Sequence, residues 1–219
     1  MKILAISDVP SKLLWDESVR KRLEGIDLIL SCGDLPKKYL EYLTNFTTVP
    51  ILYVHGNHDG SYKESEPGGC ICVDDQVYVW KGLRIMGLGG SIRYNCEETF
   101  QYTEKEMRRR MRRLWFKAHR AGGIDLLLTH SPAAGLNDGN DRAHKGFACF
   151  NDLLEEYQPK WFVHGHVHLS YNANLPRVCT HGQTTVINAT ERYTFEIPDP
   201  DPVARKRFFW NDPAFPTKN

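Results

Sequence analysis

Acidic, carboxamide and imidazole side chains recur along this chain at one kind of place, directly after short apolar runs. They are Asp8 after residues 2–7, Asp34 after 26–31, Asn57, His58 and Asp59 after 50–54, His130 after 124–129, and His166 and His168 after 160–164. A single polar residue in such a position is usually a turn former or a helix cap. Five such positions are harder to explain by turns, so we expect these side chains to share one site.

Mixed oxygen and nitrogen ligands suit borderline metal ions. We therefore expect one or two divalent ions per chain, with manganese favoured and iron or zinc as alternatives. The expected ligands are Asp8, Asp34, Asn57, His130, His166 and His168. Two ions about 4 Å apart, bridged by one carboxylate, lower the pKa of a shared water and hold both oxygens of an in-line displacement. The pattern therefore predicts hydrolysis of a phosphoester by metal-bound hydroxide.

Short strands and helices must position these residues. The apolar, β-branched runs predict strands at 2–7, 26–31, 50–54, 77–80, 83–88, 124–129, 160–164, 184–188 and 193–197. Helices are expected at 12–23, 37–44, 104–120 and 150–157, the third opening with a capping box from Thr103 to Glu106. This order indicates a layered α/β protein with mixed sheets. Ligands bind at the carboxyl ends of strands in open α/β sheets, where Gly33, Gly56 and Gly165 would let loops approach closely.

The same residues resemble the motifs of a known family, the calcineurin-like metallophosphoesterases, over about residues 1 to 190. The motifs are Asp8, Gly33-Asp34, Gly56-Asn57-His58-Asp59, His130 and Gly165-His166-Val167-His168. Residues 129–132, 144–146, 159 and 164–166 are similar to a compact phosphodiesterase-type subgroup, which favours phosphodiesters over monoesters. The resemblance implies a four-layer α-β-β-α sandwich, with two mixed sheets flanked by helices and the metal site at the carboxyl ends of the strands.

The resemblance also implies a role for each residue of the site. Asp34 would lie between two metals, with Asn57, His130 and His166 completing one position and Asp8 and His168 belonging to the other. His58 would protonate the leaving group or stabilise the transferring phosphoryl group, and Asp59 would orient the His58 imidazole.

One residue departs from the family pattern. The first motif of the family is Asp-x-His, and here it reads Asp8-Val9-Pro10. Proline has no metal-binding side chain, so the Asp8/His168 position lacks one protein ligand. Waters could fill the gap, His55 or His164 could substitute, or only the other position could bind metal. The departure leaves open a two-metal site with one weak position, catalysis with one metal, or a non-catalytic site.

Two further segments carry weaker patterns. His144 and Lys145 end a long polar loop, 135–146, and could contact substrate phosphate, although a solvated loop explains them equally well. Five arginines between 108 and 113 could face a nucleic acid. However, Met107, Met111, Leu114 and Trp115 form an apolar stripe, so we expect the arginines on the solvated face of a helix. Nucleic-acid binding is therefore disfavoured but stays open.

Length and composition indicate one globular domain. The chain has 219 residues, of which 41% are hydrophobic, and 28 basic against 27 acidic side chains. We expect a single domain at 1–197 and a proline-rich arm, 198–219, packed on it. No apolar run is long enough to span a bilayer, and the six cysteines are expected to be thiols in the cytoplasm. The sequence gives no indication of oligomeric state. The leading hypothesis is an enzyme acting on a small phosphoester, and the alternative is a weakened phosphoesterase fold kept as a partner-binding module.

Overall fold

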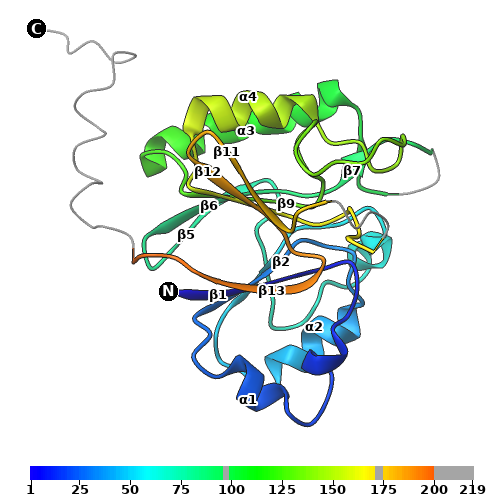
Figure 1. Cartoon of the computed structure of the whole chain (residues 1–219), viewed down its shortest axis with the longest axis vertical. Coiled ribbons are helices and arrows are strands. Elements are labelled where there is room, and N and C mark those ends of the chain that lie inside the picture. The colour runs from blue at the N-terminus through cyan, green and yellow to red at the C-terminus, as the bar shows by residue number, and fades with distance from the viewer. Residues whose placement is uncertain (96–98, 171–174, 200–219) are drawn as a thin grey trace, which may run out of the picture.

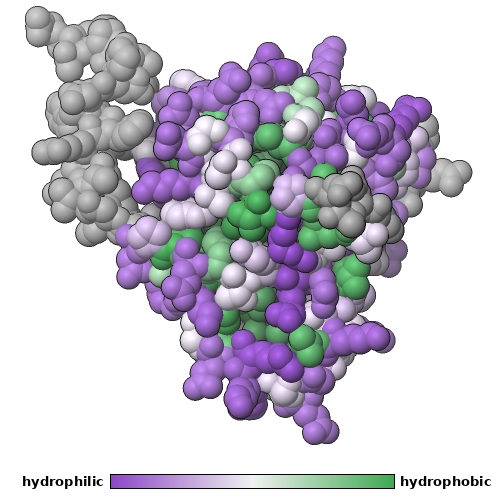
Figure 2. All heavy atoms as spheres, viewed as in Figure 1, coloured by the Kyte–Doolittle hydropathy of each residue, from purple (hydrophilic) through white to green (hydrophobic). Residues whose placement is uncertain are grey.

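Two packed β-sheets lie between two layers of helices in this protein (Figure 1). The computed structural model describes residues 1–95, 99–170 and 175–199. Residues 200–219 of the expected C-terminal arm, 198–219, therefore lie outside the described residues. On the face seen in Figure 2, hydrophilic side chains cover most of the helix layers, and hydrophobic ones reach the surface mainly between them.

The first sheet contains five strands in the order β13-β1-β2-β3-β4. Their bounds are β1 (Lys2–Ser7), β2 (Leu28–Ser31), β3 (Ile51–Tyr53), β4 (Ile71–Cys72) and β13 (Glu191–Glu196). Pairing is parallel from β1 to β4, and β13 runs antiparallel to β1. The parallel strands thus point their carboxyl ends to one edge.

The second sheet contains six strands in the order β11-β12-β10-β9-β6-β5. Their bounds are β5 (Gln76–Trp80), β6 (Leu83–Leu88), β9 (Leu126–Thr129), β10 (Trp161–His164), β11 (Val178–His181) and β12 (Thr184–Asn188). The four central strands are parallel and both edge strands are antiparallel. A small parallel pair, β7 (Ser91–Ile92) and β8 (Gln101–Tyr102), follows β6.

Helices cover the outer face of each sheet, and three apolar clusters hold the layers together. The helical segments are η1 (Lys12–Leu14), α1 (Val19–Leu23), α2 (Lys37–Thr44), η2 (Asp59–Lys63), α3 (Glu104–Ala121) and α4 (Ala148–Tyr157). One cluster joins the inner faces of the sheets, including Leu30 and Leu128. A second cluster joins the second sheet to α3 and α4, and a third joins the first sheet to α1 and α2. The predicted four-layer α-β-β-α sandwich with mixed sheets is confirmed.

Several predicted elements have the expected bounds, and one is wrong. Strands at 2–7, 83–88 and 184–188 and the helix at 37–44 are confirmed residue for residue. The single helix expected at 12–23 is instead a short 3₁₀ turn and a five-residue helix. The carboxylate of Asp16 accepts hydrogen bonds from the backbone N–H of Ser18 at 2.7 Å and from its hydroxyl at 2.5 Å. Such a local turn competes with the helical hydrogen bonds.

Helix α3 begins as predicted but buries one arginine. The Thr103 hydroxyl accepts from the Glu106 N–H while the Glu106 carboxylate accepts from the Thr103 N–H, which is the predicted capping box. Met107 and Leu114 are buried, but Trp115 is 41% exposed and Arg110 is only 6% exposed. The expectation that all five arginines face solvent is therefore wrong for Arg110.

A pair of carboxylates explains this burial. The Arg110 guanidinium donates to Asp74 at 2.6 Å, to Asp75 at 2.8 Å and to the carbonyl of Gly89 at 2.7 Å. It also lies over the ring of Tyr102, 4.2 Å from the centroid. Arginine is seldom buried without such partners. The partners come from other parts of the chain, so a helical pattern cannot show them.

Two remaining sequence expectations concern membranes and cysteines. Across the described residues, none of the helices is both long and apolar enough to cross a membrane. Among the described residues, the cysteines are free thiols: Cys32, Cys70, Cys72, Cys149 and Cys179.

Candidate metal centre

The chemistry-bearing residues gather where the parallel strands end. Asp8, Asp34, Asn57, His130 and His166 each follow a central strand of one of the two sheets. Asp8, Asp34 and His166 have positive φ angles of 64°, 56° and 69°. This backbone region is unfavourable for residues other than glycine, and strained residues of this kind cluster at functional sites.

The centre of the site consists of one carboxylate and two imidazoles. Ligand atoms of Asp34, His130 and His166 all lie within 4.8 Å of one another. The Asp34 Oδ2 is 3.3 Å from the Nε2 of His130, which is 3.0 Å from the Oδ1 of Asn57. His130 and Asn57 are buried. Four predicted ligands, from four separate parts of the chain, therefore converge.

The tautomer of His130 suits a metal ligand. Its Nδ1 lies 2.7 Å from the carbonyl oxygen of Cys32, to which it must donate. This leaves Nε2 facing Asp34 and Asn57. A neutral His130 would then present a lone pair toward two acceptor oxygens, an arrangement that a cation satisfies. Metal-ligating histidines usually donate their other N–H to a backbone carbonyl or carboxylate in this way.

Asp8 and His168 lie on one side of this centre. Both carboxylate oxygens of Asp8 accept from the backbone N–H of His166, at 3.0 and 3.1 Å. The Thr190 hydroxyl donates to Asp8 at 3.3 Å. Burial raises the pKa of Asp8, and the nearby His168 opposes part of that rise. Pro10 supplies no ligand on this side, because the proline side chain has no atom that can bind a metal.

The two histidines that could replace the missing ligand have other neighbours. His55 Nδ1 lies 2.9 Å from an oxygen of Asp74, and the His55 ring stacks on Phe100 with centroids 4.2 Å apart. His164 is buried, and its Nδ1 lies 3.0 Å from the carbonyl of Gly165. Neither residue belongs to the group of ligand atoms that the described part of the chain brings together.

Backbone hydrogen bonds fix the loop that carries Asn57. One oxygen of Asp59 accepts from the N–H of Gly56 at 2.7 Å and of Asp34 at 2.9 Å. The N–H of His58 donates to Asp34 Oδ1 at 2.7 Å, and the His58 side chain is exposed. Asp59 therefore holds two ligand loops together. That Asp59 also orients the His58 imidazole stays a prediction.

Glycines make this close approach feasible, as the sequence predicts. A Cβ on Gly56 would overlap the Asp34 carboxylate, and one on Gly33 would overlap the backbone of Gly56. At Gly165 a Cβ would overlap the Ser7 side chain. Gly33 and Gly56 thus let two loops of the first sheet meet, and Gly165 lets the end of β10 approach the end of β1 in the other sheet.

The electrostatics of the centre favour a positive charge. Burial raises the pKa of Asp34, but the charge of His130 and its hydrogen bond outweigh it and lower this pKa to about 2. Burial lowers the pKa of His130, but the Asp34 carboxylate outweighs it and raises this pKa to about 9. Burial and the charge of Asp34 raise the pKa of Asp59 to about 6, and burial raises that of Asp8. A proton on His130 thus offsets carboxylates that a metal ion would otherwise neutralise.

The loop at 135–146 reaches the site through its backbone. His166 Nε2 lies 2.7 Å from the carbonyl oxygen of Ala143. The His144 ring is 5.3 Å from that of His166 and is held by Asp141 at 2.9 Å. Lys145 is exposed. Substrate binding by His144 and Lys145 stays a prediction.

Three residues that contact the site were not predicted from the sequence. Tyr94 accepts a hydrogen bond from Asn57 Nδ2 at 3.2 Å, Thr190 contacts Asp8, and Ala143 contacts His166. Thr190 does follow a predicted strand, 184–188, but its hydroxyl is not among the carboxylate, carboxamide and imidazole groups that suggested metal ligands. Tyr94 lies six residues beyond the strand at 83–88, and Ala143 contributes only its carbonyl. No pattern of residue types could identify them.

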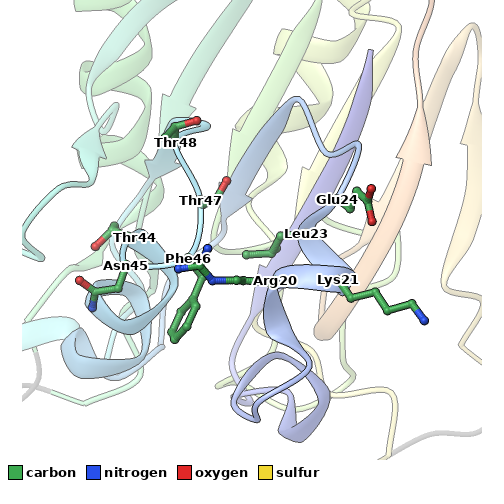
Figure 3. A pocket seen from close by; sticks show the side chains of 9 residues that line it. All are labelled: Arg20, Lys21, Leu23, Glu24, Thr44, Asn45, Phe46, Thr47 and Thr48. Atoms are coloured by element: carbon green, nitrogen blue, oxygen red, sulfur yellow. The ribbon is translucent and has the colours of Figure 1, made fainter.

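The structure also has a separate surface hollow of about 660 Å³ (Figure 3). It is lined by Arg20, Lys21, Leu23, Glu24, Thr44, Asn45, Phe46, Thr47 and Thr48. Residues 44–48 precede β3, so the hollow borders the amino end of this strand, whereas the candidate centre follows its carboxyl end.

The fold and the converging ligands define an α-β-β-α sandwich with a candidate metal centre between its sheets. The family model of the calcineurin-like phosphoesterase superfamily domain matches residues 1–191. The chain belongs to this superfamily, and the resemblance noted in the sequence is confirmed.

The chain is also similar to individual proteins. The uncharacterised protein MJ1162 of Methanocaldococcus jannaschii is 23% identical over 208 residues, which cover 89% of this chain and 90% of that protein. Human metallophosphoesterase domain-containing protein 1 is 32% identical over 71 residues, which cover 31% of this chain and only 20% of the human protein. The crystal structure of TT1561 of Thermus thermophilus has the same fold, with a TM-score of 0.59 and 18% identity over 87% of this chain and 89% of that one.

Proposed function

We propose that this protein hydrolyses small phosphodiesters, with manganese as the favoured metal and iron or zinc as alternatives. Membership of the superfamily supports a metallophosphoesterase. The observation that carries the proposal is the convergence of Asp34, His130 and His166, with Asn57 beside them, in a centre whose carboxylates favour a cation. The preference for diesters follows from the similarity to the phosphodiesterase-type subgroup.

Asp34, Asn57, His130 and His166 would hold the first metal ion. Asp8 and His168 would contribute to a second, weaker position, because Pro10 supplies no ligand. A bound divalent ion supplies Lewis-acid chemistry, which neutralises phosphate charge and lowers the pKa of a coordinated water. The hydrogen bonds that the Asp59 carboxylate accepts, and the one that the His58 N–H donates to Asp34, keep the ligands in place.

His58 is the proposed catalytic residue. Its side chain is exposed at the edge of the centre, while its backbone N–H is tied to Asp34. An imidazole in this place would donate a proton to the leaving oxygen or a hydrogen bond to the phosphoryl group. His144 and Lys145, from the loop that touches His166, would bind substrate phosphate.

Hydrolysis of bis-p-nitrophenyl phosphate with added Mn²⁺ tests the proposal, and p-nitrophenyl phosphate tests the preference for diesters. Asp34→Asn should remove activity together with metal binding. His58→Ala should lower kcat by about 10²–10⁴-fold, as the loss of a general acid does, while metal binding stays intact. His181→Ala, on the edge strand β11, serves as the control and should match wild type.

The missing ligand at Pro10 favours one rival function, a partner-binding module whose catalysis has decayed. If wild type, Asp34→Asn and His58→Ala were equally inert on both substrates after loading with Mn²⁺, Fe²⁺ or Zn²⁺, the rival would replace the enzymatic proposal. Pro10→His gives a second test, because restoring the imidazole should tighten binding at the weaker position.

A further inference from the structure

The carboxamide of Asn57 has two different ends. Asn57 is 1% exposed. Its Oδ1 lies 3.0 Å from His130 Nε2, on the side of the candidate centre, and its Nδ2 donates to the hydroxyl oxygen of Tyr94 at 3.2 Å. Only the oxygen end can ligate a cation, because the amide nitrogen carries two protons and no available lone pair. The position of this group therefore depends on what holds its nitrogen end.

Tyr94 is itself held firmly by its neighbours. The N–H groups of Tyr94 and Asn95 both donate to the Oε1 of Gln101, at 3.0 and 3.2 Å, and Gln101 is 5% exposed. The N–H of Arg93 donates to the carbonyl of Tyr102 at 3.0 Å. The Arg93 guanidinium pairs with Glu106, in the cap of α3, at 3.0 Å. The tyrosine thus sits on a backbone anchored to β8 and to the start of α3.

We infer that Tyr94 is a positioning residue for metal binding, which holds the Asn57 carboxamide by its nitrogen so that the oxygen stays at the metal position. The inference rests on the proposed function, because it requires a metal at that position. Groups that hydrogen-bond to a metal ligand orient it, and their loss typically weakens metal affinity by about 10–100-fold. Tyr94 would act on the metal through Asn57 and would not itself touch the ion.

Tyr94→Phe removes only the hydroxyl and keeps the ring. Isothermal titration with Mn²⁺ should show metal affinity weaker by about tenfold than in wild type. The melting temperature in EDTA should fall only slightly, because one part-buried hydrogen bond is lost, whereas a purely structural tyrosine would lower stability without metal and leave Mn²⁺ affinity unchanged. Hydrolysis should fall at limiting Mn²⁺ and recover at saturating Mn²⁺. Tyr78→Phe, on β5, is the matched control and should bind Mn²⁺ as wild type does.

A double-mutant cycle tests whether the tyrosine acts through Asn57. In an Asn57→Ala background the nitrogen contact no longer exists, so adding Tyr94→Phe should change Mn²⁺ affinity less than twofold. The same tenfold loss in both backgrounds would overturn the inference, as would wild-type affinity in Tyr94→Phe alone. Failure of the proposed function has a different result: wild type itself would bind none of Mn²⁺, Fe²⁺ or Zn²⁺. If wild type binds metal and only these Tyr94 outcomes are wrong, the inference alone fails.

Discussion

Replacing Arg110 by methionine should be far more damaging than the same change at Arg108, two residues earlier on the same helix. Both arginines belong to one basic run in the sequence, but their partners differ in burial. Arg110 pairs with Asp74, and these side chains are 7% and 9% exposed. Arg108 pairs with Asp152, and these side chains are 44% and 56% exposed.

The expected magnitudes follow from this difference. Breaking a buried ion pair by removing one partner costs about 3–5 kcal/mol, because the other charge stays buried without compensation. We expect about 3 kcal/mol for Arg110→Met, since His55 and the N–H of Gly89 still contact the Asp74 carboxylate. The second partner, Asp75, is half exposed and adds little. Arg108→Met should cost less than about 1 kcal/mol, as exposed pairs do.

Urea denaturation followed by circular dichroism provides the assay. Each variant is compared with wild type at one pH, with metal removed, and the slope against urea is checked so that a shifted midpoint reports stability alone. A second change, Asp74→Asn, should recover part of the loss in Arg110→Met, because it removes the stranded charge. Equal losses of free energy of unfolding in Arg110→Met and Arg108→Met would refute this reasoning.

Three further predictions concern pH, the helix cap and a glycine. Burial raises the pKa of Asp74, but its hydrogen-bonded partners outweigh this and lower it, so its stabilisation is present above the unfolded pKa of about 3.9 and is lost as pH falls. The difference in unfolding free energy between wild type and Asp74→Asn should narrow below about pH 4 in denaturant titrations, and a difference that grows there would contradict the assignment. Thr103→Ala should cost about 1 kcal/mol by removing a hydroxyl that caps the N–H of Glu106, and an unchanged urea midpoint would disprove it. Gly56→Ala should abolish Mn²⁺ binding in titration calorimetry because a Cβ has no room there, whereas Gly68→Ala, near a flexible side chain only, should bind normally; equal binding would contradict this.

The fold and the convergence of the site residues could be predicted from the sequence, because both depend on where the strands end. Apolar runs mark buried parallel strands, and the residues after them must meet at one edge. This logic predicts that Asp34, His130 and His166 lie together, and in the structure their ligand atoms lie within 4.8 Å of one another. The glycines at the same strand ends also predicted that these loops approach closely.

Contacts between unrelated parts of the chain could not be predicted in this manner. Arg110 is buried because Asp74 lies beneath its helix, and Tyr94 meets Asn57 because Gln101 fixes its backbone. Each of these pairings depends on the packed fold rather than on local periodicity. The helix expected at 12–23 failed for a local reason, since apolar spacing alone does not reveal that Asp16 prefers a turn.

The pairing of β13 with β1 bears on the order in which the protein can fold during synthesis. Lys2 lies opposite Glu196, and Ser7 opposite Glu191, so β1 cannot complete its pairing until almost the whole described chain has left the ribosome. Such distant pairings are slow to form, and until then β1 presents an unpaired edge that can recruit other chains. Asp8, directly after β1, gains its neighbour Thr190 only at that late stage. Nascent chains that stall before residue 190 should therefore depend on chaperones.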